Sequence, residues 1–387
     1  MNSREKLETQ YTKVAYDQFD HRHHGAITMP IYQNSLFAFD SYDQFEQAME
    51  DVLSHHVYSR GNNPTVTYLE EKIAALEEGE EARCFASGMA AITAAILSQV
   101  QHGDHIICVH QVYGPTKEFL GSYLQRFGIE TSFVDGRLLE QWRAAIRPNT
   151  RLLYLESPTT MFFELQDLQA CTELARSIGA VTIIDNTWAT PCFQQPLSMG
   201  VDLVVHSISK YLGGHSDCVG GVVIGSKNRM TLLSNNEYML FGGIMTPQTA
   251  ALVTKGLRTL PLRMQRLESS ALKIAQHLTT LPYVNQVNYS GLPSHPQHEL
   301  ALRQMSGFSS LLSFETEESV ERMKEWANRL YYFRIAVSWG GFESLVSIKA
   351  LEPSHHQNSR CLVRLYIGME SPDDLIRDMN EAWMISV

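Results

Sequence analysis

The stretch that decides the fold is Val201–Gly221, VDLVVHSISKYLGGHSDCVGG, in which an apolar run leads into a glycine-rich turn that carries Lys210. Two hydroxyl side chains, Ser207 and Ser209, come just before this lysine. Burial at the end of a strand disfavours the ammonium form of a lysine, and a neutral lysine amine can form a Schiff base with a carbonyl. The pattern indicates a lysine that holds an aldehyde cofactor. A surface lysine in a Gly-rich loop is the alternative.

A second stretch, Ala180–Pro191 (AVTIIDNTWATP), strengthens the cofactor interpretation. Its β-branched apolar run ends at Asp185, 25 residues before Lys210. Continuous apolar strands of this length are typical of a parallel sheet covered on both faces, and ligands bind at the carboxyl ends of such strands. A carboxylate there can pair with a protonated pyridine nitrogen, as pyridoxal phosphate (PLP) requires. Alternatively, Asp185 caps the segment that follows it.

These motifs identify a resemblance to the Cys/Met-metabolism group of PLP enzymes. The group includes cystathionine β-lyase, cystathionine γ-synthase, cystathionine γ-lyase and methionine γ-lyase. The resemblance runs from Gly25 to Gly368 and implies an α/β fold, namely the PLP-dependent transferase fold type I (aspartate-aminotransferase-like). In it, a mostly parallel central sheet is joined to a smaller C-terminal α/β domain. The motifs that carry the resemblance are Tyr58-Ser-Arg-Gly-Asn-Asn-Pro64, Ser87-Gly-Met-Ala-Ala-Ile92, Asp185-Asn-Thr-Trp188, Ser207-Ile-Ser-Lys-Tyr-Leu-Gly-Gly-His-Ser-Asp217 and Ser338-Trp-Gly-Gly-Phe-Glu-Ser-Leu345.

Composition narrows the class of protein. The 387 residues, 44% of them hydrophobic and 19% charged, are ordinary for a globular enzyme with a large core. The formal charge of −11 and the absence of a Lys/Arg block argue against nucleic acid as a partner. No apolar run approaches the roughly 20 residues of a membrane span, and the polar N-terminus lacks a signal-peptide core. Six cysteines without a C-x-x-C pair indicate reduced thiols in a cytoplasmic enzyme.

Three histidine clusters raise the question of a metal: His21-Arg-His-His24, His55-His56 and His355-His356. None has a second set of ligands at helical spacing, and adjacent residues point in different directions. We expect no metal site.

The pattern of elements divides the chain into three parts: an N-terminal arm over 1–57, a large PLP-binding domain over 58–245 and a C-terminal domain over 246–387. Strands and helices alternate in the middle part, which is typical of a parallel α/β sheet. Residues 248–278 form a long helical stretch interrupted near Pro261. The other expected helices are 11–20, 41–52, 65–78, 89–99, 115–127 and 166–178, and the expected strands are 83–85, 105–109, 152–155, 181–184, 203–205 and 222–224.

PLP needs a phosphate site and a ring contact besides Lys210 and Asp185. Ser87, Gly88 and Met89 lie where a strand gives way to a helix, whose free N–H groups and dipole attract anions. The resemblance implies that Gly88 and Met89 bind the phosphate through backbone N–H groups, together with Ser207 and Ser209. It also implies that Tyr113 stacks on the pyridine ring and is, with Lys210, a catalytic residue, although a tyrosine near a strand end is more often a packing residue.

Tyr58 and Arg60 lie in a Gly/Asn/Pro-rich loop that could equally be a solvated turn. The resemblance implies that this pair reaches into the active site of a neighbouring subunit and binds its cofactor phosphate, a role that suits the guanidinium fork. It therefore implies a homotetramer, a dimer of dimers, with shared active sites.

The substrate is expected to be a small amino acid. Arg364 alternates with apolar residues on a strand, and a buried charge is costly unless it is paired. The resemblance implies that Arg364 binds the α-carboxylate, and that Ser338 helps to shape that pocket.

Departures from the commonest family pattern favour one subclass. After Glu156-Ser-Pro158 the chain has Thr159 and Thr160 where the family usually has Thr-Asn, so the Asn contact with the cofactor's phenolic oxygen is lost or made by a hydroxyl. Trp188 and Trp339 resemble the β-lyases, whereas the Tyr58–Pro64 loop is shared with the γ-enzymes. The sequence predicts a lyase that cleaves L-cystathionine by β-elimination, with Lys210 as the base that removes the α-proton. Cystathionine γ-lyase, cystathionine γ-synthase, methionine γ-lyase and a non-catalytic PLP-binding protein remain alternatives.

Overall fold

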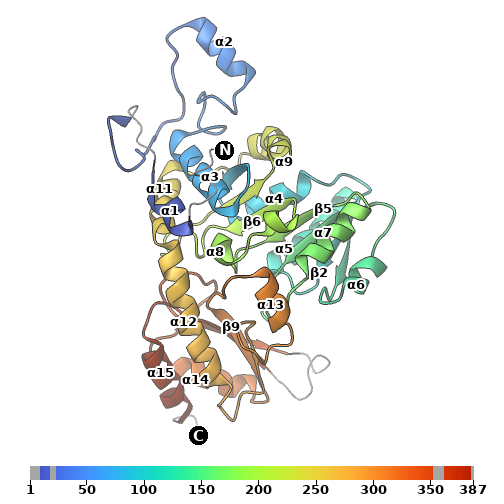
Figure 1. Ribbon diagram of the computed structural model, residues 1–387, viewed down its shortest axis with the longest axis vertical. Coiled ribbons are helices and arrows are strands. Elements are labelled where there is room, and N and C mark those ends of the chain that lie inside the picture. The colour runs from blue at the N-terminus through green and yellow to red at the C-terminus, as the bar shows by residue number, and fades with distance from the viewer. Residues whose placement is uncertain (1–8, 18–22, 352–360, 385–387) are drawn as a thin grey trace.

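A computed structural model of the chain describes residues 9–17, 23–351 and 361–384. Two sheets lie one above the other in Figure 1, and the helices α11 (Pro247–Arg258) and α12 (Leu260–Leu278) run down one side of the molecule from the first sheet to the second. The break between these helices comes at Thr259, immediately before Leu260-Pro261, where the expected interruption lies.

The first sheet has seven strands in the order β1-β7-β6-β5-β4-β2-β3. Only β7 runs against its neighbours, so the sheet is mostly parallel, as expected. The inner strands are buried along nearly their whole length because helices cover both faces. The strands are β1 (Glu81–Phe85), β2 (His105–Val109), β3 (Glu130–Val134), β4 (Thr150–Glu156), β5 (Val181–Asp185), β6 (Leu203–Ser207) and β7 (Gly221–Gly225).

Helices connect these strands. Because β2, β4, β5 and β6 are parallel, their carboxyl ends lie at the same edge of the sheet. Asp185 and the turn that contains Lys210 lie at that edge. The helices in this part are α3 (Pro64–Glu77), α4 (Gly88–Leu97), α5 (Gly114–Glu118), α6 (Leu139–Ala144), α7 (Leu168–Ser177), α8 (Thr190–Phe193), α9 (Lys227–Leu233) and α10 (Met239–Phe241), with short π or 3₁₀ turns at η3 (Phe119–Tyr123), η4 (Leu124–Phe127), η5 (Pro196–Met199) and η6 (Ser234–Tyr238).

The second sheet has five strands in the order β10-β11-β12-β9-β8 and is mostly antiparallel. Helix α12 packs against β9 and α14 packs against β11, while α15 contacts both of these helices. Its elements are β8 (Gln286–Asn288), α13 (His298–Gln304), β9 (Leu311–Thr316), α14 (Val320–Arg329), β10 (Arg334–Ile335), β11 (Leu345–Ala350), β12 (Cys361–Tyr366) and α15 (Pro372–Met384).

The N-terminal part carries α1 (Gln10–Ala15) and α2 (Tyr42–Glu50). In Figure 1, α2 and the extended chain beside it project away from the two sheets. Large apolar side chains are exposed along this arm; Ile27 is 83% exposed and Leu36 is 63% exposed. Apolar surface of this kind is typical of a face that another chain covers.

The expected elements are present with shifted ends, apart from two corrections. The helix expected over 115–127 keeps α-helical geometry only over α5 and continues through η3 and η4. The structure also adds β3 and the helices α6, α8, α9 and α10, which the pattern did not indicate; β3 is an edge strand with no fully buried residue. The end of the helix expected over 11–20 lies outside the described residues. The boundaries at 57/58 and 245/246 stay a prediction. No helix among the described residues has the length and apolar character to cross a membrane.

Candidate active site

Lys210 lies in the turn after β6, where its backbone is packed against the loop Ser338-Trp339-Gly340 of the second sheet region. A Cβ on Gly340, whose φ is +94°, would lie 2.7 Å from the Lys210 Cα. The Lys210 Nζ donates a hydrogen bond to the Ser338 Oγ and lies 5.5 Å from the centre of the Trp339 ring. The structure thus brings together Lys210 and Ser338, which were expected in one site.

The surroundings of the Lys210 amine favour its neutral form. Burial and, after it, the nearby Arg364 cation lower the pKa of Lys210 to about 8, although the Asp185 carboxylate acts in the opposite direction. An amine with this pKa is available as a nucleophile and as a base near neutral pH.

Arg364 projects from β12 toward the same loop. Its Nη2 lies 3.5 Å from the Ser338 carbonyl oxygen. Burial lowers the pKa of the guanidinium, and no carboxylate among the described residues forms an ion pair with it. A partly buried guanidinium without an anion is suited to bind the carboxylate of a ligand.

Asp185 ends β5 and is partly buried. Its Oδ1 accepts hydrogen bonds from the backbone N–H and the hydroxyl of Thr187, whereas no described hydrogen bond occupies Oδ2. Burial raises the pKa of Asp185, and His206 and Lys210 oppose that rise. Asp185 is not the N-cap of the next helix, α8, whose N-cap is Ala189. The bonds of Asp185 to Thr187 leave one carboxylate oxygen available.

The expected phosphate site lies at the start of α4. Ser87 is the N-cap, and its Oγ accepts the N–H of Ala90. A Cβ on Gly88 would lie 3.0 Å from the Ser207 Oγ, so the glycine lets the helix end approach this hydroxyl closely without displacing it. The first N–H groups of a helix have no partner within it, and here they lie beside Ser207.

Two other residues expected at the phosphate have contacts of their own. The Ser209 Oγ accepts the N–H of Gly220 at 3.0 Å. The Met89 sulfur lies 4.0 Å from the Thr116 hydroxyl, so only the backbone N–H of Met89 is a candidate ligand.

Tyr113 is the N-cap residue of α5 and is 44% exposed, so its side chain is accessible to a ligand. Its backbone N–H donates to the Glu156 Oε2 at 2.9 Å. The Thr160 N–H donates to the other oxygen of Glu156, Oε1, at 2.7 Å. The ring-stacking candidate and the segment expected near the phenolic oxygen are therefore held by one carboxyl group.

Tyr58 and Arg60 are near each other but are not in contact with the Lys210 group. The Arg60 guanidinium lies 5.8 Å from the Tyr58 ring centre, and its Cδ borders Gly242. Tyr58 is 51% exposed. A single chain therefore leaves this pair accessible, as a role in a neighbouring subunit would require.

Several buried polar residues around the site have roles that the sequence did not indicate. Glu77 lies on α3 and holds two residues beside Asp185: Asn186 donates to its Oε1 at 3.0 Å, and His206 Nε2 lies 3.2 Å from its Oε2. Glu156 holds the two segments described above. The signal for Glu156 was visible, because it ends an apolar strand in the same way as Asp185; the Glu77 contacts connect residues more than 100 positions apart.

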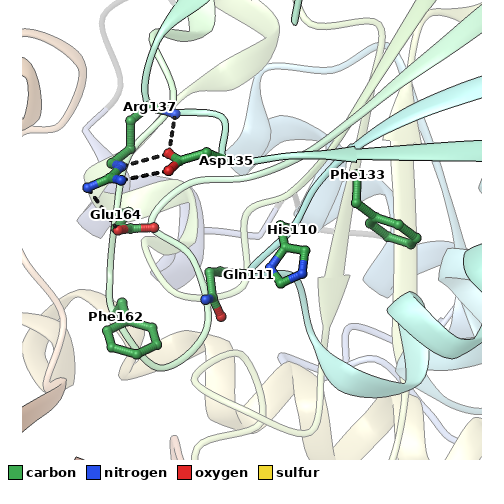
Figure 2. A pocket seen from close by; sticks show the side chains of 7 residues that line it. All are labelled: His110, Gln111, Phe133, Asp135, Arg137, Phe162 and Glu164. Atoms are coloured by element: carbon green, nitrogen blue, oxygen red, sulfur yellow. Dashed lines mark hydrogen bonds and ion pairs between the residues drawn. The ribbon is translucent and has the colours of Figure 1, made fainter. Parts of the chain in front are cut away.

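A cavity of about 400 Å³ lies beside this group and not within it (Figure 2). Figure 2 shows Arg137 paired with Asp135 and Glu164 on one side of it. None of the expected site residues lines the cavity; its walls are His110, Gln111, Phe133, Asp135, Arg137, Phe162 and Glu164.

The structure gives no support to a metal site. Within residues 9–17, 23–351 and 361–384, no three His, Cys, Asp or Glu side chains gather in a way that could hold a metal ion. His21, His355 and His356 lie outside these ranges. The six cysteines are all unpaired.

Comparisons with known proteins agree with this geometry. The family model of the Cys/Met metabolism PLP-dependent enzymes matches residues 10–384. The chain is 39% identical over 367 residues to a cystathionine gamma-lyase of Bacillus subtilis, which covers 92% of this chain and 94% of that one. It is also 39% identical over 370 residues to a cystathionine beta-lyase of Lactococcus lactis subsp. cremoris, with coverage of 92% and 94%. A crystal structure of metB from Corynebacterium glutamicum superposes with a TM-score of 0.90 at 33% identity and covers 98% of this chain and 99% of that chain.

Proposed function

The chain belongs to the Cys/Met metabolism family of PLP-dependent enzymes, and from this premise we propose that it is a carbon–sulfur lyase that cleaves L-cystathionine by β-elimination. Cystathionine and water would give homocysteine, pyruvate and ammonia. The family fixes the cofactor and the class of enzyme, while relatives of similar identity carry out β- and γ-chemistry. The choice between them therefore depends on the residues at the site.

The residues fit the cofactor. A nucleophilic lysine amine, an available carboxylate oxygen on Asp185 and a helix N-terminus beside the Ser207 hydroxyl match its aldehyde, ring nitrogen and phosphate. Bound PLP supplies an electron sink for the negative charge that develops when the substrate loses its α-proton.

The remaining chemistry belongs to the protein. Arg364 binds the α-carboxylate of the substrate and so directs Cα toward Lys210. The neutral Lys210 amine removes the α-proton, and Ser338 holds that amine by the hydrogen bond to its Oγ. Asp185 would stay ionised because its carboxylate would pair with the protonated ring nitrogen of the cofactor. The thiolate of homocysteine then leaves from Cβ, and Lys210 as the ammonium is the nearest proton donor.

The observation that carries β-elimination is the position of Trp339. Its ring lies 5.5 Å from the Lys210 Nζ and 5.3 Å from the Tyr211 ring. We infer that the indole narrows the space beside the base, where γ-elimination would need room for proton movement at Cβ. β-Elimination needs a proton removed only at Cα, whereas γ-elimination also needs protons moved at Cβ.

γ-Elimination is the second candidate, and the Tyr58–Pro64 loop favours it because the γ-enzymes share that loop. Identification of the products from L-cystathionine decides between the two. Pyruvate with homocysteine supports the proposal, and 2-oxobutyrate with cysteine as the main products contradicts it. Faster γ-replacement on an activated homoserine would contradict it as well.

We also propose a homotetramer, a dimer of dimers, in which Tyr58 and Arg60 bind the cofactor phosphate of a neighbouring subunit. The exposed apolar arm and the exposed Tyr58 support this assembly. A cytoplasmic location is part of the proposal, and the six unpaired cysteines support it because thiols stay reduced there.

A further inference from the structure

Glu156 is a buried carboxyl group that connects two segments of the active site. It ends β4 and is 6% exposed. Its Oε2 accepts the N–H of Tyr113, at the carboxyl end of β2, and its Oε1 accepts the N–H of Thr160, in the loop after β4. One side chain thus holds both the ring-stacking candidate and the segment nearest the expected phenolic oxygen.

Glu156 also has a like charge beside it. It pairs in register with Asp185 on the adjacent strand β5, so the buried carboxyl group of Glu156 lies next to the partly buried one of Asp185 at the carboxyl ends of the strands. The other titratable groups facing Glu156 are Cys108 on β2 and Tyr154 on β4, and burial keeps both neutral by raising the pKa of the thiol and of the phenol. His206 and Lys210 act on the Asp185 side of the pair.

Some of these surroundings raise the pKa of Glu156, and others lower it. Burial and the charge of Asp185 raise the pKa of Glu156 to about 8, while the N–H groups of Tyr113 and Thr160 oppose the rise. An ionised carboxylate accepts both N–H groups. A protonated carboxyl group still accepts them, but without the negative charge these hydrogen bonds are weaker, so protonation weakens the link between the two segments.

We propose that Glu156 is a positioning residue which is protonated in the protein without cofactor, and which ionises when a positive ring nitrogen pairs with Asp185. Compensation of the Asp185 charge removes the repulsion between the two carboxyl groups. The O–H bond of Glu156 breaks, its proton goes to solvent, and the resulting carboxylate fastens the segments of Tyr113 and Thr160 around the ring. This inference rests on the proposed pairing of Asp185 with the ring nitrogen.

The test counts the protons released on binding. Pyridoxamine 5′-phosphate is a suitable probe because it lacks the aldehyde and forms no bond with Lys210. Calorimetric titration of the cofactor-free protein at pH 7, in two buffers of different ionisation enthalpy, gives the number of protons exchanged with solvent. The wild-type protein should release about one proton more than the Glu156→Gln variant. The variant should also bind the probe on the order of tenfold more weakly, because an amide cannot accept both N–H groups.

Glu164→Gln is the matched control. Glu164 lies in the loop after β4, as Thr160 does, and its carboxylate pairs with Arg137. Its replacement should leave the number of released protons unchanged. Glu156→Asp separates the ionisation of the carboxyl group from its hydrogen bonds to the two N–H groups. It also replaces Glu156→Gln if that variant does not fold. Its carboxyl group still ionises, so the proton count should stay near that of the wild-type protein, while the shorter side chain should weaken binding.

Equal proton counts for wild-type and Glu156→Gln would overturn the proposal, and so would unchanged affinity in Glu156→Asp. The Asp185→Asn variant shows whether such a result contradicts the role of Glu156 or the proposed pairing of Asp185 with the ring nitrogen. If Asp185→Asn binds the probe with wild-type affinity and proton count, then the pairing with the ring nitrogen is wrong. If only the Glu156 variants match the wild type, that pairing stands and the role of Glu156 is wrong.

Discussion

The amine of Lys210 lies between Arg364 and Asp185, and these two charges act on its pKa in opposite directions. Because only the neutral amine attacks an aldehyde, the rate of PLP attachment to the cofactor-free protein should rise with pH and level off above about 8. Replacing Arg364 with Gln removes a cation that disfavours the ammonium form, so the midpoint should move upward by about one pH unit. Stopped-flow measurement of the visible absorbance at each pH checks this. A midpoint that stays in place would show that Arg364 does not act on the amine.

Trp339 is the residue on which the reaction type depends. Its ring contacts the ring of Tyr211. A purely structural role for Trp339 would be packing against Phe342 in the core, but Phe342 is 58% exposed. Replacing Trp339 with Leu should open the space beside Lys210 and raise the fraction of 2-oxobutyrate formed from cystathionine, with pyruvate formation reduced. The ratio of the two keto acids, separated by chromatography, measures this effect. An unchanged ratio would mean that the indole does not select between the reactions.

At the level of elements, the loop from Ser338 to Gly341 determines where Lys210 lies. Gly340 and Gly103 both have left-handed φ angles, of +94° and +88°, but a Cβ would strike the Lys210 backbone only at Gly340 and would meet nothing within 4 Å at Gly103. Gly103→Ala should therefore cost only the backbone strain, about 1–2 kcal/mol of unfolding free energy, and keep full activity. Gly340→Ala should add the steric clash and lower activity by on the order of a hundredfold, since a misplacement of 1 Å can have that effect.

Unfolding curves and kcat/KM for the two variants test this comparison. Equal activity in both would show that the close approach of Gly340 to Lys210 does not position the amine.

The buried strands that end at the site could be predicted from the sequence. The strands β2, β5 and β6 are short apolar runs, and their ends carry the residues that chemistry requires, so Asp185 and Lys210 could be found without a structure. Edge elements such as β3 were missed because partial burial leaves no clear apolar period. The role of Glu156 was missed for another reason: its partners are backbone N–H groups of two loops, and no sequence pattern records backbone contacts.

At the scale of the whole molecule, one chain does not bring Tyr58 and Arg60 to Lys210. Arg60→Ala and Lys210→Ala chains should each be inactive alone, but mixing them under conditions of subunit exchange should restore part of the activity. Some hybrid sites would then combine an intact Lys210 from one chain with an intact Arg60 from another. Activity assays with mass measurement of the mixed oligomers check this. No recovery, when hybrids are demonstrably present, would exclude sites shared between chains.

We propose that Lys210 both anchors the cofactor and moves the α-proton. Borohydride reduction of the PLP-loaded enzyme, followed by mass spectrometry of its peptides, tests this double role most directly. We expect a permanent pyridoxyl phosphate group on the peptide that contains Lys210, and no such peptide and no turnover in Lys210→Ala. A label on a different lysine, or turnover that survives in Lys210→Ala, would contradict it.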